Sequence, residues 1–254
     1  MNESRIVAVS GATAGIGLGV ARQFAAAGHR VLGSARGVER GRTVEAELRA
    51  AGLDFTFVPA DVSTTAGSQA LIDAAVATHG GLDVLVNNAG TVGTRPLAPF
   101  MDVTEQHFDE LVATNLRSMF FTTQLAAKAM ADLGGRGGTV FNLGSLAGET
   151  VAAEMLTYRT TKAAAMFMSE CLADALRPAG ITVHTIVVHR VVSEGGRRTL
   201  EQRIVDIGAD EAEAERLRRD YAATATEPDD LGRRLVHMLD HPGVTIGPGF
   251  TVRR

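Results

Sequence analysis

Short apolar runs rich in Val and Ile alternate along the chain with longer amphipathic segments. The short runs lack polar alternation and therefore predict strands buried on both faces, whereas the longer segments predict helices. The predicted strands cover residues 6–9, 29–34, 55–60, 82–86, 139–143, 181–188 and about 244–252. The predicted helices cover about 18–28, 38–51, 65–79, 104–130, 157–177 and 229–239.

Strands that alternate with helices in this way form parallel βαβ units. The chain is therefore predicted to be an α/β protein, with one Rossmann domain over residues 1–254 built on a doubly wound parallel sheet of about seven strands with helices on both faces. Ligands of such sheets bind beyond the carboxyl ends of the strands, where Gly-, Asn- and Ser-rich segments follow the first, fourth and fifth strands. A polar stretch, about 193–223, is predicted to be a substrate lid over that edge.

Composition and charge narrow the classes of partner. The 254 residues are 45% hydrophobic and 21% charged, with a formal net charge of -4, which gives no reason to expect nucleic acid or a membrane surface as partner. No apolar run is long enough to cross a bilayer or to act as a secretory leader, so we expect a cytoplasmic protein. Cys171 is the single cysteine, which excludes an internal disulfide and a thiolate metal cluster, and it is expected to be buried on its helix.

Gly11, Gly15 and Gly17 lie between the first strand and the first helix, in the spacing G-x-x-x-G-x-G. Glycine at a turn allows the backbone to approach a pyrophosphate closely, and the helix that follows offers unpaired N–H groups to the phosphates. The alternative is a glycine-rich turn without a ligand, which any strand–helix junction can contain. The turn predicts a dinucleotide site only together with the rest of the chain.

Tyr158 and Lys162 are four positions apart on a predicted helix and share one face. A nearby ammonium favours the phenolate, so we expect the pKa of Tyr158 to be lowered and the tyrosine to exchange a proton with a carbonyl oxygen. Ser145 follows the fifth strand, where its hydroxyl can hold the same oxygen, and the amide of Asn115 is expected to anchor a water molecule that relays protons to the lysine. Taken singly, these residues are more often a surface pair, a turn residue and a solvent-facing amide.

Taken together, these residues resemble the short-chain dehydrogenase/reductase family. The resemblance rests on the glycine-rich turn, on Asp61-Val62, on Asn87-Asn88-Ala89-Gly90, and on Asn115, Ser145 and Tyr158-x-x-x-Lys162, all in family order. It covers about residues 4–185 and favours bacterial ketoreductases that process polyketide or fatty-acyl intermediates.

The resemblance implies a role for each of these residues. The pyrophosphate would be bound by Gly11, Thr13, Gly15, Ile16 and Gly17, the adenine by Asp61 and Val62, and the ribose by Asn88, Ala89 and Gly90. Lys162 would hold the hydroxyls of the nicotinamide ribose and tune Tyr158, the general acid. Ser145 would hold the carbonyl oxygen, and Asn115 would support the proton relay.

The end of the second strand distinguishes the two nicotinamide cofactors. An acidic residue there would bind ribose hydroxyls and repel a 2′-phosphate, but this chain carries Arg36 and, nearby, Arg40, with no acid before Glu39. A guanidinium pairs well with a phosphate, so NADP(H) is the expected cofactor, unless Arg36 is simply solvated.

Two segments depart from the family. After the sixth strand the family carries Pro-Gly, then a residue whose backbone binds the nicotinamide amide, then Thr. This chain has Val188-His189 in place of Pro-Gly, with Val191 and Ser193 expected at the two cofactor positions, and His189 is left as a substrate contact, an extra acid/base or a solvated side chain. In the family the last strand commonly supports a tetramer interface, but here it lacks the usual acidic residue and paired glycines. The expected homo-oligomer is therefore either a dimer or a tetramer.

The sequence therefore predicts an NADP(H)-dependent oxidoreductase that moves hydride between nicotinamide and a small carbonyl compound, in the direction of ketone reduction in polyketide-like biosynthesis. The substrate is expected to be apolar, because Phe100, Val151, Met155 and Leu156 lie in the predicted walls of the site. One alternative keeps the fold but catalyses dehydration, cyclisation or epimerisation without net redox change. Another is a non-enzymatic nucleotide-sensing or partner-binding protein.

Overall fold

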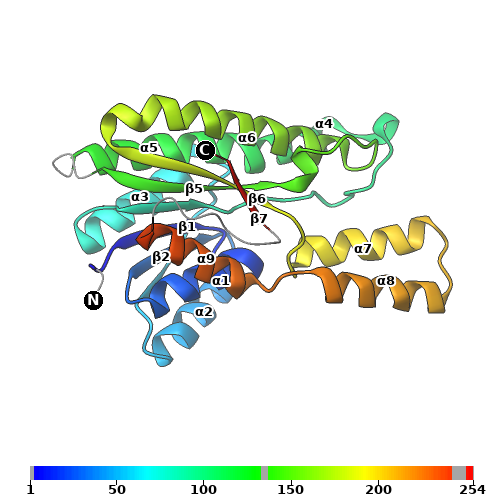
Figure 1. Ribbon diagram of the computed structural model, residues 1–254, viewed down its shortest axis with the longest axis horizontal. Coiled ribbons are helices and arrows are strands. Elements are labelled where there is room, and N and C mark those ends of the chain that lie inside the picture. Colours follow the sequence, from blue (N-terminus) through cyan, green and yellow to red (C-terminus); the bar gives the residue numbers. More distant parts are fainter. Residues whose placement is uncertain (1–2, 133–136, 242–249, 254) are drawn as a thin grey trace.

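One sheet between two layers of helices makes up the body of the protein (Figure 1). The computed structural model describes residues 3–132, 137–241 and 250–253. The strand order is β3-β2-β1-β4-β5-β6-β7. The strands are β1 (Ile6–Ser10), β2 (Arg30–Ala35), β3 (Phe55–Pro59), β4 (Val84–Asn87), β5 (Gly138–Ser145), β6 (Ile181–Val188) and β7 (Phe250–Arg253).

The helices lie on both faces of the sheet, as the alternating pattern predicted. One face carries α1 (Gly15–Ala26), α2 (Val38–Ala50) and α9 (Pro228–Asp240), and the other carries α3 (Thr65–His79), α5 (Ser118–Asp132) and α6 (Leu156–Leu176). Each face has its own apolar core, because neighbouring residues of a strand point to opposite sides. Val7 and Val9 of β1 pack in the first core, and Ile6 and Ala8 pack in the second.

The last strand departs from the predicted parallel sheet. The strands β1 to β6 pair in parallel, but β7 runs antiparallel to β6, from Thr185 opposite Arg253 to Val188 opposite Phe250. The apolar pattern of a strand is the same in either direction, so the sequence carries no signal for this reversal, and an antiparallel edge strand is common in such sheets. The predicted strand residues before Phe250 lie outside the described residues.

The long helix predicted at 104–130 is interrupted in its middle. The structure has α4 (Glu105–Val112), a π-helical turn over Ala113–Arg117, and then α5. Turns of this kind occur where a side chain takes backbone partners from another segment, often at functional sites. Asn115, at the centre of the turn, is only 1% exposed.

Cys171 corrects another expectation, because its thiol is exposed rather than buried. The buried residues of α6 follow a helical stripe that ends in Ala165, Met166 and Ser169. Cys171 lies off this stripe, since buried positions recur every three to four residues.

The predicted polar excursion forms a hairpin of two helices, α7 (Glu194–Asp206) and α8 (Glu211–Thr224), which projects from the body of the protein (Figure 1). The Arg218 guanidinium of α8 donates two hydrogen bonds to the Glu201 carboxylate of α7, at 2.9 and 2.8 Å. Among the described residues, no helix is long and apolar enough to span a membrane. A cytoplasmic location stays a prediction.

Candidate active site

The glycine-rich turn has the shape of a cradle between β1 and α1. Gly11 and Gly15 have positive φ angles of 69° and 50°, which favour glycine. A Cβ at Gly17 would lie 2.1 Å from the carbonyl oxygen of Gly11, so only glycine fits there. The N-cap residue of α1, Ala14, has no side-chain cap, and the first N–H groups of the helix are therefore available to a bound anion.

Asn88 and Ala89 connect β4 to this turn. The Asn88 amide donates to the carbonyl oxygens of Ser10 and Gly11 at 2.9 and 3.0 Å. The Ser10 hydroxyl accepts from the backbone N–H groups of Asn88 and Ala89 at 3.1 and 3.0 Å. These bonds bring the Asn88–Gly90 segment to the turn, as the sequence predicted, but they also give Ser10 a role that its place at the end of an apolar strand did not reveal.

Asn115 holds the segment that follows Gly90. Its Oδ1 accepts from Thr91 N at 2.8 Å, and its Nδ2 donates to Thr91 O at 2.9 Å and to Thr161 Oγ1 at 3.0 Å. Both donor hydrogens of the amide are thus taken by protein atoms. The expected water relay through this amide stays a prediction, in which the water molecule would use the second lone pair of Oδ1.

Tyr158 and Ser145 come together at the carboxyl end of β5. A hydrogen bond joins the Ser145 side chain to the Tyr158 phenol, and the Ser145 hydroxyl also accepts from Ala147 N at 3.2 Å. Burial raises the pKa of Tyr158, and the bond to Ser145 only partly opposes this effect. The expectation of a lowered phenol pKa is therefore wrong for the protein without ligand, and the phenol is a proton donor at neutral pH.

Lys162 is buried below Tyr158, with its Nζ 6.0 Å from the centroid of the phenol ring. The ammonium donates to the carbonyl oxygen of Leu143 in β5 at 3.0 Å. Burial lowers the pKa of Lys162 to about 8, because removal from water disfavours the charged ammonium. A Cβ at Gly90 would lie 3.5 Å from Nζ and 3.4 Å from Asn115 Oδ1, so these three residues surround one point at the edge of the sheet.

The residues expected around the adenosine lie at the ends of β2 and β3. Arg36 is exposed, and Arg40 Nε donates to the carbonyl oxygen of Thr13 in the glycine-rich turn at 3.3 Å. The Asp61 carboxylate accepts from Ser63 N at 3.0 Å, and the Val62 side chain is buried in the core. Ile16 packs half-buried against the core beneath the turn. The predicted set therefore gathers along one edge of the sheet.

The segment after β6 returns to the glycine-rich turn. Ser193 Cβ lies 3.7 Å from the position a Cβ would take at Gly15, and its hydroxyl caps α7 by accepting from Gly196 N at 3.1 Å. Val191 is 5% exposed and pairs with Thr226 in an isolated parallel bridge. His189 is exposed.

A buried polar network connects β4, β5 and β6 to α5 and α6 behind this edge of the sheet, and the sequence did not predict it. Asn87 Nδ2 donates to Thr123 Oγ1 and to Asn142 Oδ1, both at 2.8 Å. Asn142 Nδ2 donates to Ser169 Oγ at 2.9 Å, and Thr185 Oγ1 donates to the same oxygen at 2.7 Å. The sequence signal for this network is a polar residue inside each of three apolar strands. A buried polar group is costly unless it has a hydrogen-bond partner, so such residues are expected to bond to one another.

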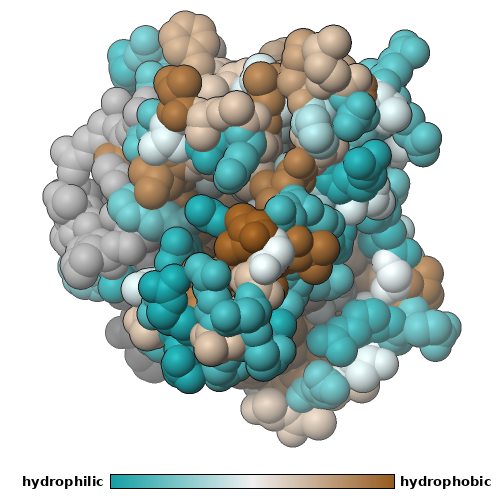
Figure 2. Space-filling view, turned by 90° about the vertical axis from the view of Figure 1, so that its right-hand side faces the viewer, coloured by the Kyte–Doolittle hydropathy of each residue, from teal (hydrophilic) through white to brown (hydrophobic). Residues whose placement is uncertain are grey.

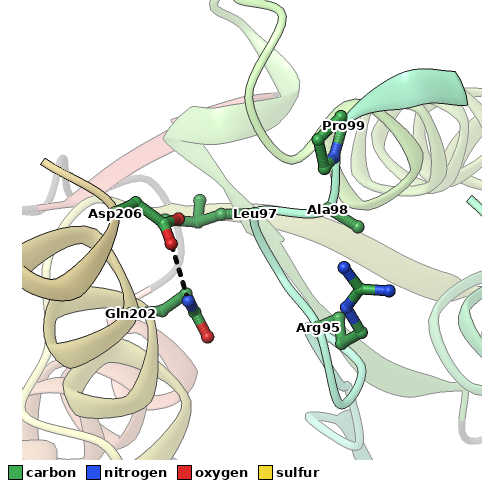
Figure 3. A pocket seen from close by; sticks show the side chains of 6 residues that line it. All are labelled: Arg95, Leu97, Ala98, Pro99, Gln202 and Asp206. Atoms are coloured by element: carbon green, nitrogen blue, oxygen red, sulfur yellow. Dashed lines mark hydrogen bonds between the residues drawn. The ribbon is translucent and has the colours of Figure 1, made fainter. Parts of the chain in front are cut away.

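A cavity of about 380 Å³ opens between the loop after β4 and α7 (Figure 3). Arg95, Leu97, Ala98 and Pro99 line one side, and Gln202 and Asp206 line the other. Gln202 Nε2 donates to Asp206 Oδ1 at 2.8 Å, and Arg95 is exposed at the opposite wall. Among the described residues, no cluster of His, Cys, Asp and Glu could hold a metal ion.

Comparison with known proteins gives a family match and several similar proteins. Residues 5–203 match the short chain dehydrogenase family. The chain is 31% identical to the L-rhamnose 1-dehydrogenase (NAD(P)(+)) of Azotobacter vinelandii, over 92% of this chain and 89% of that protein. It is 33% identical to the granaticin polyketide synthase putative ketoacyl reductase 1 of Streptomyces violaceoruber, over 71% and 65% of the two chains. A crystal structure of a variant actinorhodin polyketide ketoreductase with NADPH superposes with a TM-score of 0.84 and 30% identity, over 94% and 91%.

Proposed function

The chain belongs to the short-chain dehydrogenase/reductase family, and we propose that it is an NADP(H)-dependent ketoreductase that reduces a small carbonyl compound in polyketide-like biosynthesis. The observation that carries the proposal is the meeting of Tyr158, Ser145 and Lys162 at the carboxyl end of β5, where phenol and serine are hydrogen-bonded and the ammonium lies beneath. Ketoacyl reductases among the relatives support this choice of reaction.

The glycine-rich turn fits a dinucleotide. Glycine at position 17 allows the turn to pack against Gly11 and Asn88 where a Cβ would clash, and the uncapped start of α1 offers N–H groups to a pyrophosphate. Gly11, Thr13, Gly15 and Ile16 complete this wall. Asn88, Ala89 and Gly90 would border the ribose, Asp61 and Val62 the adenine, and Val191 and Ser193 the nicotinamide amide.

Ser145, Tyr158 and Lys162 then act at the carbonyl oxygen of the substrate. When bound beside these residues, a nicotinamide would supply a hydride to the carbonyl carbon. Ser145 donates a hydrogen bond to the carbonyl oxygen, and Tyr158 transfers its hydroxyl proton to that oxygen as the C=O π bond opens, which gives the alcohol. Lys162 stabilises the phenolate that remains and binds the ribose hydroxyls, and the phenolate regains its proton from solvent.

Two arginines favour the phosphorylated cofactor. The hydrogen bond of Arg40 to Thr13 O places this guanidinium beside the turn, and Arg36 is exposed at the end of β2. Neither makes an ion pair with a described residue, so both are available to a 2′-phosphate. The NADPH of the actinorhodin enzyme supports the same assignment.

The substrate would enter between the loop 95–99 and α7, where the cavity opens, and the α7–α8 hairpin would act as its lid. Exposed apolar side chains border this end of the molecule: Phe100 (66%), Met101 (88%), Val151 (105%), Leu156 (42%) and Val205 (72%). Figure 2 shows apolar groups at this end separated by hydrophilic ones. These surfaces support a largely apolar substrate.

Nicotinamide fluorescence titrations with NADPH and NADH test the cofactor assignment. The wild type is expected to prefer NADPH, and Arg36→Ala and Arg40→Ala to weaken NADPH binding on the order of tenfold while leaving NADH unchanged. Arg177→Ala is the control, because Arg177 pairs with Asp174 at the far end of α6. Equal losses for both nucleotides, or a preference for NADH, would contradict the assignment.

The segment after β6 lacks the Pro-Gly pair of the family, so a reaction without net redox change is the alternative to test. Ketoreduction consumes NADPH, so its absorbance band must fall in step with product. Product formed with no net change in that band would favour dehydration, cyclisation or epimerisation. Nucleotide binding without turnover of any screened carbonyl compound would favour a sensor.

The protein is also proposed to form a homo-oligomer. Phe167 of α6 is 70% exposed and Phe120 of α5 is 41% exposed, on the helical layer that faces away from α1 and α9. Light scattering of the wild type and of Phe167→Glu tests this, with a smaller mass expected for the variant. A monomeric wild type would contradict the proposal.

A further inference from the structure

The backbone after β6 follows a defined path although the Pro-Gly turn is missing. Val188 ends the strand, and His189 and Arg190 are exposed. A Pro-Gly pair fixes one backbone angle and frees the next, and neither Val188 nor His189 does so. Something else must hold Val191 and Ser193 over the glycine-rich turn.

Tyr221 of α8 makes a direct bond to this segment. Its hydroxyl donates to the carbonyl oxygen of Val191 at 2.9 Å, and the ring is half-buried. The Arg190 guanidinium lies 5.8 Å from the centroid of the same ring and donates to Thr224 Oγ1 at 2.6 Å. The end of α8 therefore contacts two successive residues of the segment.

The backbone beyond α8 adds a second attachment. Thr226 N donates to Arg190 O at 2.9 Å, and Val192 N donates to Thr226 O at 3.0 Å. This short parallel bridge fixes the segment on both sides of Val191. The Val191 carbonyl oxygen takes no part in this bridge and accepts instead from the Tyr221 hydroxyl. The segment is therefore held by both backbone and side-chain bonds.

The tyrosine also reaches the start of α7. A Cβ at Gly196 would lie 2.2 Å from the Tyr221 hydroxyl oxygen, so the phenol occupies the space beside this glycine. Gly196 N in turn donates to Ser193 Oγ, and Ser193 lies against Gly15. One phenol therefore packs between both ends of the segment that covers the pyrophosphate cradle.

We propose that Tyr221 is a positioning residue that holds Val191–Ser193 in the shape that receives the nicotinamide end of the cofactor, in place of the missing Pro-Gly turn. The inference rests on the proposed function. Tyr221 acts through one hydrogen bond and the packing of its ring. Its contacts make the α7–α8 hairpin part of the cofactor site.

Tyr221→Phe removes the donor and keeps the ring. NADPH is expected to bind about fivefold more weakly to the variant, the scale of one lost hydrogen bond. Binding of 2′,5′-ADP, which has the phosphorylated adenosine but no nicotinamide, is expected to be unchanged. In turnover, the KM for NADPH should rise with little change in kcat.

Arg218→Gln is the matched control. It removes the bonds between α8 and Glu201 of α7 but leaves the Tyr221 phenol in place, so NADPH and 2′,5′-ADP are expected to bind as in the wild type. Circular dichroism and thermal melting of both variants establish that they fold.

Hydrogen exchange without any nucleotide provides an independent measurement. The amides of Val192 and Thr226 are expected to exchange faster in Tyr221→Phe than in the wild type and Arg218→Gln, because the bridge loses its neighbouring support. Unchanged exchange, unchanged NADPH affinity, or equal losses for NADPH and 2′,5′-ADP would each overturn the inference. If the wild type binds neither NADPH nor NADH, the proposed function fails as well. If the wild type binds and Tyr221→Phe binds equally well, only the inference on Tyr221 fails.

Discussion

The Lys162 ammonium donates to the carbonyl oxygen of Leu143 at 3.0 Å, whereas the centroid of the Tyr158 ring lies 6.0 Å from it. In the protein without ligand, the lysine is thus held by a neutral backbone group and not by the phenol. A neutral oxygen stabilises a buried charge less than a carboxylate does, which explains why the pKa of Lys162 is lowered to about 8. Burial of the Lys162 ammonium therefore lowers the stability of the folded protein.

Lys162→Met should remove this cost. The unfolded chain keeps the ordinary lysine pKa of 10.5, so between about 8 and 10.5 it binds more protons than the folded protein does, and the free energy of unfolding of the wild type rises with pH. Below pH 8 the full penalty, about 3 kcal/mol, applies to the wild type alone. Urea denaturation should therefore find the variant more stable at pH 7, with a difference that shrinks towards pH 10.

The chain offers a matched control for this experiment in Lys128→Met, since Lys128 is exposed on α5. Its effect on the free energy of unfolding should be small and independent of pH. A difference between wild type and Lys162→Met that stays constant from pH 7 to 10 would contradict the assigned burial cost.

Tyr158→Phe should abolish proton transfer while leaving the cofactor site intact. Reduction of any ketone that the wild type accepts is expected to fall by at least about a hundredfold, with NADPH affinity within about twofold. Because burial keeps the pKa of Tyr158 above its usual value, wild-type reduction should not decline through loss of the phenol proton across neutral pH. Ser145→Ala should give a smaller loss, and an active Tyr158→Phe enzyme would exclude this tyrosine as the acid.

Asn115→Leu should destabilise the protein by about 1–3 kcal/mol, because it leaves the N–H and C=O of Thr91 without their partners. Gln124→Leu, an exposed substitution on the following helix, should change the free energy of unfolding by less than about 0.5 kcal/mol. Chemical denaturation of the two variants makes the comparison. Equal stability would show that the Thr91 bonds contribute nothing to the folded state.

Gly17→Ala should prevent dinucleotide binding, since the added Cβ would lie 2.1 Å from Gly11 O and 2.4 Å from Asn88 Nδ2. The accompanying loss of stability should be about 1–3 kcal/mol. Gly52→Ala is the comparison: its φ of 77° also disfavours alanine, by about 1 kcal/mol, but nothing lies within 4 Å of the added atom. Cofactor titration should find Gly52→Ala normal, and a binding-competent Gly17→Ala would refute the cradle.

The fold was largely predictable because its signals are local. The helix at 65–79 and the strand at 181–188 have the predicted limits, since capping, glycine and apolar runs act within a few residues. The π-helical turn at Asn115 was not predictable in this way. Its cause is the hydrogen bonding of the Asn115 amide to Thr91, 24 positions earlier, and to Thr161, 46 positions later.

The candidate site also combines features that follow from the sequence with features that only the packed structure decides. The positions of Gly11, Ser145, Tyr158 and Lys162 at one sheet edge follow from residue spacing once a parallel sheet is assumed. The pKa directions do not follow, because burial is the largest cause at both Tyr158 and Lys162, and burial depends on the packed structure. Tyr221 carried no sequence signal, since its partner Val191 lies 30 positions away.

The sequence by itself determined the alternation of strands and helices, the family, and the residues available for chemistry, because apolar periodicity and motif spacing are properties of the chain alone. The tertiary structure alone decided the antiparallel direction of β7, the commitment of the Asn115 amide, the resting partner of Lys162 and the attachment of Val191 to Tyr221. Each of these depends on which distant groups meet in a low-dielectric interior, and there the cost of an unpaired polar group outweighs local preference.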